Sequence, residues 1–219
     1  MNSEYRNPTR AGIVNTGMDL PSFSVTWDYR CPFARNAHDH LVTALRGGAA
    51  WDVSFVPFSL TQTHIEDGEL SVWEDPSKHA DLLALQAAVV VRDNFSEHFL
   101  DLHEALFKAR HEQSKDVRDP EVVREALVEA GIADPSSIFD AISTGEPLAQ
   151  VRKEHEQAVS EHDVFGVPTF ISGDHAAFVR IMTRPQGDAA TARHTIERIV
   201  NFVSSEVDLN EMKRTRLDR

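Results

Sequence analysis

The sequence predicts an α/β fold that is interrupted by a large α-helical insertion. Three observations support this prediction. The chain opens with a strand, a helix and a second strand; about one hundred residues with apolar side chains at helical spacing follow; two short strands and a final helix close it. With 219 residues, 41% of them hydrophobic, the chain suits one elaborated domain with a sizeable core.

The opening segment has the pattern of a β-α-β unit. Residues 22–29 alternate apolar and polar side chains, which is the two-residue period of a strand. Pro32 suits the first turn of a helix, and Gly47 and Gly48 are expected to end that helix. Residues 52–58 alternate again, so we expect a second strand, parallel to the first, with a right-handed crossover between them.

After residue 62 the spacing of apolar residues changes to three or four, which is typical of amphipathic helices. An acidic residue followed by proline marks four boundaries, since proline is tolerated at the first helical position and a negative charge is favourable there. The predicted helical segments are residues 76–93, 95–112, 120–130 and 147–163.

The last part of the chain returns to short apolar, β-branched runs. Residues 167–171 and 176–182 are predicted to form a hairpin across Ser172, Gly173 and Asp174. Residues 188–207 carry apolar side chains on one stripe, which predicts a closing helix against the sheet.

Composition excludes several classes of function. The net charge of −13 repels a phosphate backbone, and no basic stripe with interleaved aromatic residues is present, so we expect no nucleic-acid partner. No apolar stretch reaches the roughly 20 residues of a membrane span, and residues 1–20 are a polar lead-in without the apolar core of a secretory signal. A single cysteine, Cys31, forms no internal disulfide and suits a reducing compartment. We therefore expect a cytoplasmic protein.

Two motifs carry a family resemblance: Cys31-Pro32-Phe33-Ala34 after the first strand, and Gly166-Val167-Pro168-Thr169-Phe170 at the start of the third. Together with the element order, they resemble the DsbA-like thioredoxin family, the group that also includes FrnE-like proteins, hydroxychromene carboxylate isomerases and kappa-type glutathione transferases. This resemblance implies a discontinuous thioredoxin-like domain over residues 20–61 and 164–207, a helical insertion over 62–163 and a tail over 208–219.

Cys31 is the candidate catalytic residue. A thiol at a helix N-terminus is stabilised as the thiolate by unpaired N–H groups and the helix dipole, so we expect a lowered pKa for Cys31. Arg30 and Arg35 flank the cysteine and either add positive potential or point into water. The alternative is that Cys31 is simply a small buried apolar residue.

The resemblance also implies a partner for the thiol. Pro168 is expected to be a cis proline opposite Cys31, and the Val167 backbone is expected to hydrogen-bond a bound peptide or thiol. We include Thr169 in the candidate substrate-binding loop. Arg180 or Arg184 is a further candidate, for the carboxylate of a thiol cosubstrate, although pairing with surface carboxylates is the more common role of such arginines.

The first motif departs from the family pattern, because Ala34 stands where the second cysteine of Cys-x-x-Cys is expected. A methyl group cannot resolve a mixed disulfide, so an external thiol must complete any turnover. We expect a monothiol oxidoreductase that uses glutathione, mycothiol or an equivalent small thiol as cosubstrate, with a small thiol or disulfide as substrate and no tightly bound cofactor. The alternatives are a thiol-cofactor-dependent isomerase or transferase, and a non-catalytic thioredoxin-like binding protein.

Other kinds of site are not indicated. The eleven histidines lack a metal-binding spacing, so we expect no metal and interpret them as solvated or capping residues. No nucleotide-binding glycine motif or nucleophile elbow is present. The oligomeric state stays open, a homodimer included, because no helix shows a sustained heptad.

Overall fold

The computed structural model describes residues 20–214. Residues 1–19 of the lead-in and the last five residues of the predicted tail lie outside this range. None of the helices in the described range has the length and apolar composition needed to cross a bilayer.

The centre of the fold is a four-stranded sheet in the order β2-β1-β3-β4. Strand β1 (Phe23–Trp27) pairs in parallel with β2 (Val53–Pro57), as the β-α-β prediction requires. On its other side β1 pairs antiparallel with β3 (Thr169–Ser172), which forms the predicted hairpin with β4 (His175–Phe178). The two halves of the sheet therefore come from opposite ends of the chain.

Strand β4 is shorter than predicted, since residues 179–182 leave the sheet. They run along helix α1 (Pro32–Arg46) instead. The side-chain amide of Asn36 donates to the carbonyl of Ile181 at 2.9 Å, and His40 Nε2 lies 3.1 Å from the carbonyl of Thr183. The apolar side chains of this segment pack on a helix. The sequence pattern of such a segment is the same as that of a strand, so the pattern could not separate the two.

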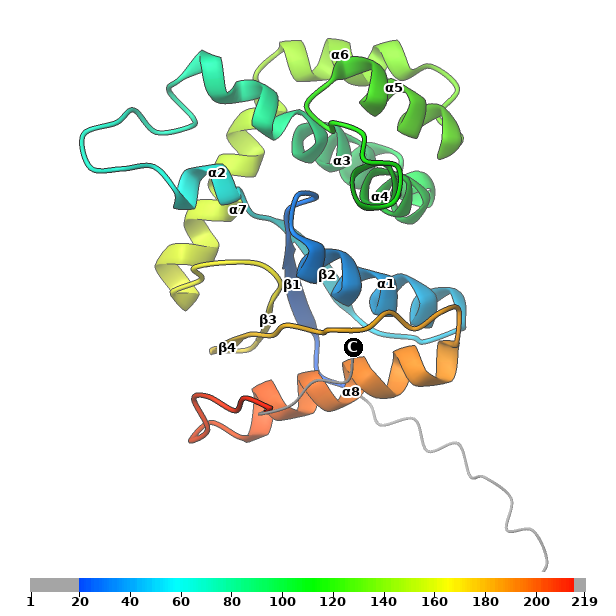
Figure 1. Cartoon of the computed structure of the whole chain (residues 1–219), viewed down its shortest axis with the longest axis vertical. Helices are drawn as coiled ribbons and strands as arrows, with labels where there is room; N and C mark the ends of the chain where they lie inside the picture. The colour runs from blue at the N-terminus through cyan, green and yellow to red at the C-terminus, as the bar shows by residue number, and fades with distance from the viewer. Residues whose placement is uncertain (1–19, 215–219) are drawn as a thin grey trace, which may run out of the picture.

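Helix α1 packs against the closing helix α8 (Ala189–Ser205), which also contacts β3 and β4. The approach is close enough that a Cβ atom on Gly47 would overlap the Cβ of Ala189. In Figure 1 α8 lies at the lower end of the molecule and α1 lies at its middle. The upper end is formed by α3 (Leu83–Asn94), α4 (Ser96–His111), α5 (Pro120–Glu129) and α6 (Pro135–Ser143). Helix α7 (Glu146–His162) runs from that group toward the sheet and contacts both α3 and β2.

The insertion is helical, as predicted, but it is divided differently from the sequence pattern. Residues 76–93 form a 3₁₀ segment, η1 (Pro76–Leu82), followed by an α-helix, so the single predicted helix is wrong in its first half. Two helices had no predicted segment of their own: α2 (Leu60–Thr63), which is a single turn, and the longer α6 (Pro135–Ser143). The remaining elements are α2 (Leu60–Thr63), α3 (Leu83–Asn94), α4 (Ser96–His111), α5 (Pro120–Glu129) and α6 (Pro135–Ser143).

Acidic residues before proline begin three of these elements. The side chains of Asp75, Asp119 and Asp134 each accept a hydrogen bond from the backbone N–H two residues later, with proline in the first turn. The fourth boundary differs: Gly145, with a φ of 81°, precedes α7, and Glu146 is its first residue. The left-handed backbone at this point explains the glycine.

The expectation of solvated or capping histidines is wrong for four of them. His38, His40, His103 and His155 are all buried. Each has a hydrogen-bonding partner inside the fold, which offsets part of the cost of taking an imidazole out of water.

Three buried side chains form one continuous hydrogen-bonded chain, which we call the Tyr29–His103–His38 chain. His38 Nε2 lies 3.2 Å from the Thr26 carbonyl, which only accepts, so Nε2 carries the proton and Nδ1 accepts. His103 Nε2 then donates to His38 Nδ1 at 2.8 Å, and the hydroxyl of Tyr29 donates to His103 Nδ1 at 2.9 Å. Both histidines are neutral in this arrangement. It joins α1 to α4, and so the sheet layer to the insertion.

Candidate active site

Cys31 is the N-cap of helix α1. Its backbone is extended, with φ −88° and ψ 119°, and its Sγ accepts a hydrogen bond from the backbone N–H of Ala34 at 3.4 Å. Pro32 occupies the first helical turn, where its missing N–H costs no hydrogen bond. The position expected for the sulfur, at the leading end of the first helix, is therefore confirmed.

The two sequence motifs meet in space. Cys31 Sγ lies 3.3 Å from the carbonyl oxygen of Val167, to which the thiol donates. The peptide bond between Val167 and Pro168 is cis. A contact across 136 positions of sequence thus brings the lone sulfur against the backbone of the proline loop.

The lowered pKa expected for Cys31 is wrong. Burial raises the pKa of the thiol, since only 8% of the residue is exposed, and the negative charge of Asp28 acts in the same direction. The backbone N–H groups of Ala34 and Phe33 and the charge of Arg180 lower the pKa, but by less than burial raises it. The resting state is therefore a protonated thiol with polar partners, which also differs from the alternative of a purely apolar cysteine.

Thr169 supports the proline loop from within. The residue is buried, its hydroxyl donates to the carbonyl of Gly166 at 2.8 Å, and its backbone N–H donates to the hydroxyl of Thr26 at 2.8 Å. Both polar groups of Thr169 are thus engaged inside the protein. This arrangement suits a positioning residue better than the substrate contact we expected.

The two arginines beside Cys31 in sequence are both paired with carboxylates. Arg30 binds Asp28 at 3.1 Å and lies 3.5 Å from Asp81, and Arg35 pairs with Glu112. Asp28 is buried and also accepts the backbone N–H of Leu60, so this carboxylate ties β1 to the start of α2. Neither arginine is among the groups that lower the pKa of Cys31.

The two arginines after β4 have different roles. Arg184 pairs with Asp39 and, at 3.0 Å, with Glu112, which is the common surface role. Arg180 is exposed and lies over two aromatic rings, those of Phe33 and Phe178, at 5.5 Å from each centroid. Its charge acts on Cys31 although 149 positions separate the two residues.

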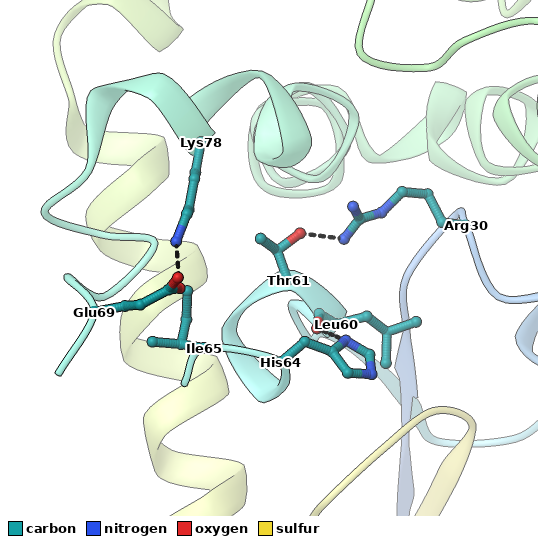
Figure 2. Close-up of a pocket in the computed structure, with 7 residues that line it drawn as sticks. All are labelled: Arg30, Leu60, Thr61, His64, Ile65, Glu69 and Lys78. Carbon is teal, nitrogen blue, oxygen red and sulfur yellow. Dashed lines mark hydrogen bonds and ion pairs between the residues drawn. The ribbon is translucent and has the colours of Figure 1, made fainter. Parts of the chain in front are cut away.

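A pocket is lined in part by Arg30, the residue that precedes Cys31 in the sequence (Figure 2). Arg30 reaches it from the end of β1 and donates to the hydroxyl of Thr61 at 2.6 Å, and Lys78 pairs with Glu69 at 3.0 Å. Its cations therefore already have carboxylate partners. Within residues 20–214 no group of three or more histidine, cysteine, aspartate or glutamate residues is arranged to hold a metal ion. The pocket is lined by Arg30, Leu60, Thr61, His64, Ile65, Glu69 and Lys78.

The comparison with protein families agrees with this geometry. The DSBA-like thioredoxin domain matches residues 24–184, which is most of the chain and includes both motifs. The chain belongs to the DsbA-like thioredoxin family. No curated protein sequence matches the chain.

Solved structures of this family share the fold. The cytosolic disulfide reductase DsbM from Pseudomonas aeruginosa, solved with GSH, covers 82% of this chain and 99% of its own, with a TM-score of 0.57 and 14% identity. DsbA from the same organism covers 89% of each chain, with a TM-score of 0.54 and 16% identity. BdbD from Bacillus subtilis covers 84% of this chain and 90% of its own, with a TM-score of 0.54 and 17% identity. At these identities the likeness establishes the fold.

Sequence reasoning missed two residues that build the site. Thr26 and Asp28 occupy the polar positions of the first strand pattern, yet both are buried, at 0% and 2% exposure. Thr26 holds the proline loop through Thr169, and Asp28 holds the turn before Cys31. One signal could have identified them: they are polar positions near the end of a strand that leads directly into a cysteine motif.

Proposed function

We propose that this protein catalyses thiol–disulfide exchange with Cys31 as its single reactive thiol and a small external thiol as cosubstrate. The observation that carries the proposal is the position of Cys31 Sγ, which caps α1 and lies 3.3 Å from the Val167 carbonyl beside the cis Val167–Pro168 bond. A helix N-terminus favours an attacking thiolate, and the backbone of the proline loop lies beside the sulfur, where a partner would bind.

The reaction has two exchanges. The Cys31 thiolate attacks one sulfur of a disulfide, a new S–S bond forms, the old one breaks, and the partner leaves as a thiolate. A second, external thiolate then attacks the mixed disulfide, which restores Cys31 and releases a disulfide. Ala34 is fully buried and has no thiol, so the second attack comes from outside the chain.

Glutathione, mycothiol or a similar small thiol is the proposed cosubstrate. A lone cysteine suits a reducing compartment such as the cytoplasm, where small thiols are abundant. The similarity to a structure described as a cytosolic disulfide reductase with GSH supports the same choice by analogy. Val167 and Pro168 are proposed to contact the bound partner, and Thr169 to hold their loop.

The resting thiol must lose its proton before it attacks. Because burial raises the pKa of Cys31, only a small fraction of the protein carries the thiolate near neutral pH. The positive charge of Arg180 and the N–H groups at the start of α1 favour the charged form. The proton passes from Sγ to solvent, and the exchange rate is expected to rise with pH.

Intact mass spectrometry with oxidised glutathione tests the proposal. The wild-type chain is expected to gain one glutathionyl group, and Cys31→Ser to gain none. Ala34→Cys is a matched gain-of-function variant: its second thiol displaces glutathione and closes a Cys-x-x-Cys disulfide, so the adduct disappears. Both rates are divided by the fraction of Cys31 present as thiolate, because burial lowers that fraction in the folded chain. An adduct that forms no faster per thiolate on the folded chain than on the chain unfolded in guanidinium would overturn the proposal.

One observation favours a second candidate, a thiol-cofactor-dependent isomerase or transferase. A protonated Cys31 that donates a hydrogen bond is suited to hold and activate the sulfur of a bound cofactor without exchange. Serine donates in the same way, so turnover that survives in Cys31→Ser supports this candidate. Loss of turnover together with a trappable mixed disulfide supports thiol–disulfide exchange.

A further inference from the structure

Arg180 and three aromatic side chains form a surface beside the active-site turn. The Cζ atom of Arg180 lies 5.5 Å from the ring centroids of both Phe33 and Phe178. Phe33 belongs to the cysteine motif, and Phe178 is the last residue of β4. Rings that hold the face of a guanidinium leave its N–H donors at the edge available for a ligand.

The position of Arg180 is held on both sides. The backbone N–H of Val179 donates to the carbonyl of Pro168 at 3.0 Å, and the side-chain amide of Asn36 donates to the carbonyl of Ile181 at 2.9 Å. Arg180 is therefore fixed between the proline loop and α1, along the segment that follows β4 in Figure 1. Because the backbone on both sides of Arg180 is already ordered, less conformational entropy is lost when a ligand binds there.

The charge of Arg180 has no carboxylate partner among residues 20–214, although the chain carries 35 acidic residues. Arg30, Arg35 and Arg184, the other arginines near the active-site turn, each have one. An exposed guanidinium that is held in place and left without an internal anion is suited to bind an anion from solution.

The third ring extends this surface into solvent. Phe165 is 70% exposed, its ring centroid lies 5.3 Å from that of Phe178, and it precedes the proline by three positions. An aromatic side chain this exposed has a face available for a planar or apolar group. The positive charge and the free aromatic face thus meet at Phe178.

We infer that Arg180, Phe33, Phe178 and Phe165 form a subsite for an aromatic, carboxylate-bearing small disulfide or thiol. Arg180 binds the carboxylate, and Phe165 with Phe178 contacts the ring. The inference rests on the proposed function and names the class of its substrate. In the exchange, the Cys31 thiolate attacks the bound disulfide, one aromatic thiolate leaves, and the other half stays on Cys31 until an external thiol removes it.

Two reagents separate this subsite from the reactivity of Cys31. Dithiobis(nitrobenzoate) is an aromatic disulfide with carboxylates, and dithiodipyridine is an aromatic disulfide without them. Arg180 also affects the thiolate, but that effect acts on both reagents equally, so the ratio of their second-order rate constants isolates recognition of the carboxylate. Arg180→Gln is expected to lower this ratio about fivefold, as one exposed charge pair allows. Arg198→Gln, which removes the same charge from an exposed position of α8, is expected to leave it unchanged.

The aromatic part is tested with Phe165→Ser. The reference reagent is dithiodipropionate, an aliphatic disulfide with carboxylates. In this variant the rate constant for each aromatic reagent, divided by the rate constant for dithiodipropionate, is expected to fall about threefold. An unchanged ratio in Arg180→Gln, with Cys31 still reactive, overturns the subsite and leaves the proposed function intact. If none of the reagents modifies Cys31 faster per thiolate on the folded chain than on the unfolded chain, the proposed function fails and the subsite fails with it.

Discussion

Helix α1 carries two polar sites with opposite properties. At its first turn, the Cys31 sulfur has only weak partners, one N–H and one thiol contact to a carbonyl, and it lies next to a half-buried ring, Phe33, and an exposed cation. Two turns later His38 is fully buried, and every polar atom of its imidazole is hydrogen-bonded. One end of the helix is thus suited to chemistry, and its middle fastens the sheet layer to the insertion.

This contrast predicts that substitutions in the two sites affect different quantities. Loss of a member of the Tyr29–His103–His38 chain should reduce stability, because buried polar partners are left unpaired. Loss of the Cys31 sulfur should abolish exchange and leave the folded state nearly as stable.

The largest expected effect is that of His103→Leu. The hydroxyl of Tyr29 loses its acceptor and His38 Nδ1 loses its donor, so the free energy of unfolding should fall by about 3 kcal/mol, since each unpaired buried group costs about 1–3 kcal/mol. Urea denaturation measures this loss. His194→Leu, at an exposed position of α8, is the matched control and should change stability by less than about 0.5 kcal/mol. Equal losses in the two variants would contradict a structural role for the chain.

The next effect is the pH dependence of Cys31. Burial raises the pKa of this thiol above its reference value of 9.0, so the thiolate fraction is still rising at pH 9. The alkylation rate with iodoacetamide should increase about fiftyfold or more from pH 7 to pH 9, against about 25-fold for a free thiol with a pKa of 8.5. The same chain in guanidinium provides the free thiol. A plateau below pH 8 on the folded chain would show an activated thiolate instead.

A smaller effect is the loss of stability in mild acid. Burial lowers the pKa of His38 to about 4, below its value of about 6.5 in the unfolded chain, so the unfolded state takes up the proton first as the pH falls. Stability from this group is complete above pH 6.5 and is lost between pH 6.5 and pH 4, by about 2 kcal/mol at pH 5. Denaturation curves at pH 7 and pH 5 measure the total loss, to which the other histidines whose pKa is lowered by burial add in the same direction.

His155 is the control for this pH effect, because its pKa is also lowered to about 4 by burial and it lies outside the Tyr29–His103–His38 chain. The His155→Phe variant should retain a loss of at least about 2 kcal/mol, because His38 remains and burial also lowers the pKa of His103. If this variant shows no decrease in stability between pH 7 and pH 5, His38 does not contribute to the effect.

The smallest effect is that of Cys31→Ser on stability. Serine is a preferred N-cap and replaces the weak sulfur contact with Ala34, so the free energy of unfolding should change by less than about 1 kcal/mol. Thermal unfolding of the variant checks this, and the same sample should form no mixed disulfide. A decrease above about 2 kcal/mol would mean that the sulfur stabilises the fold, and the contrast along α1 would then be lost.

Local patterns in the sequence were sufficient for most of the architecture. These patterns depend only on neighbours in the chain: the alternation over residues 22–29 and 52–58, the glycines after α1, and the acidic residues before proline. The strands, the helix starts and the position of Cys31 could therefore be predicted. The 3₁₀ form of η1 and the departure of residues 179–182 from the sheet depend on contacts with distant segments. Periodicity carries no information about such contacts.

What the sequence by itself determined is the identity of the site: a lone cysteine at the start of a helix, an alanine in place of a second thiol, and a proline loop near the other end of the chain. Only the tertiary structure decided the environment of that cysteine. Burial raises the pKa of Cys31, Arg30 and Arg35 are taken up by carboxylates, and the cation that acts on the sulfur is Arg180. The physical reason is that desolvation and charge depend on distances through space, which the order of residues along the chain does not contain.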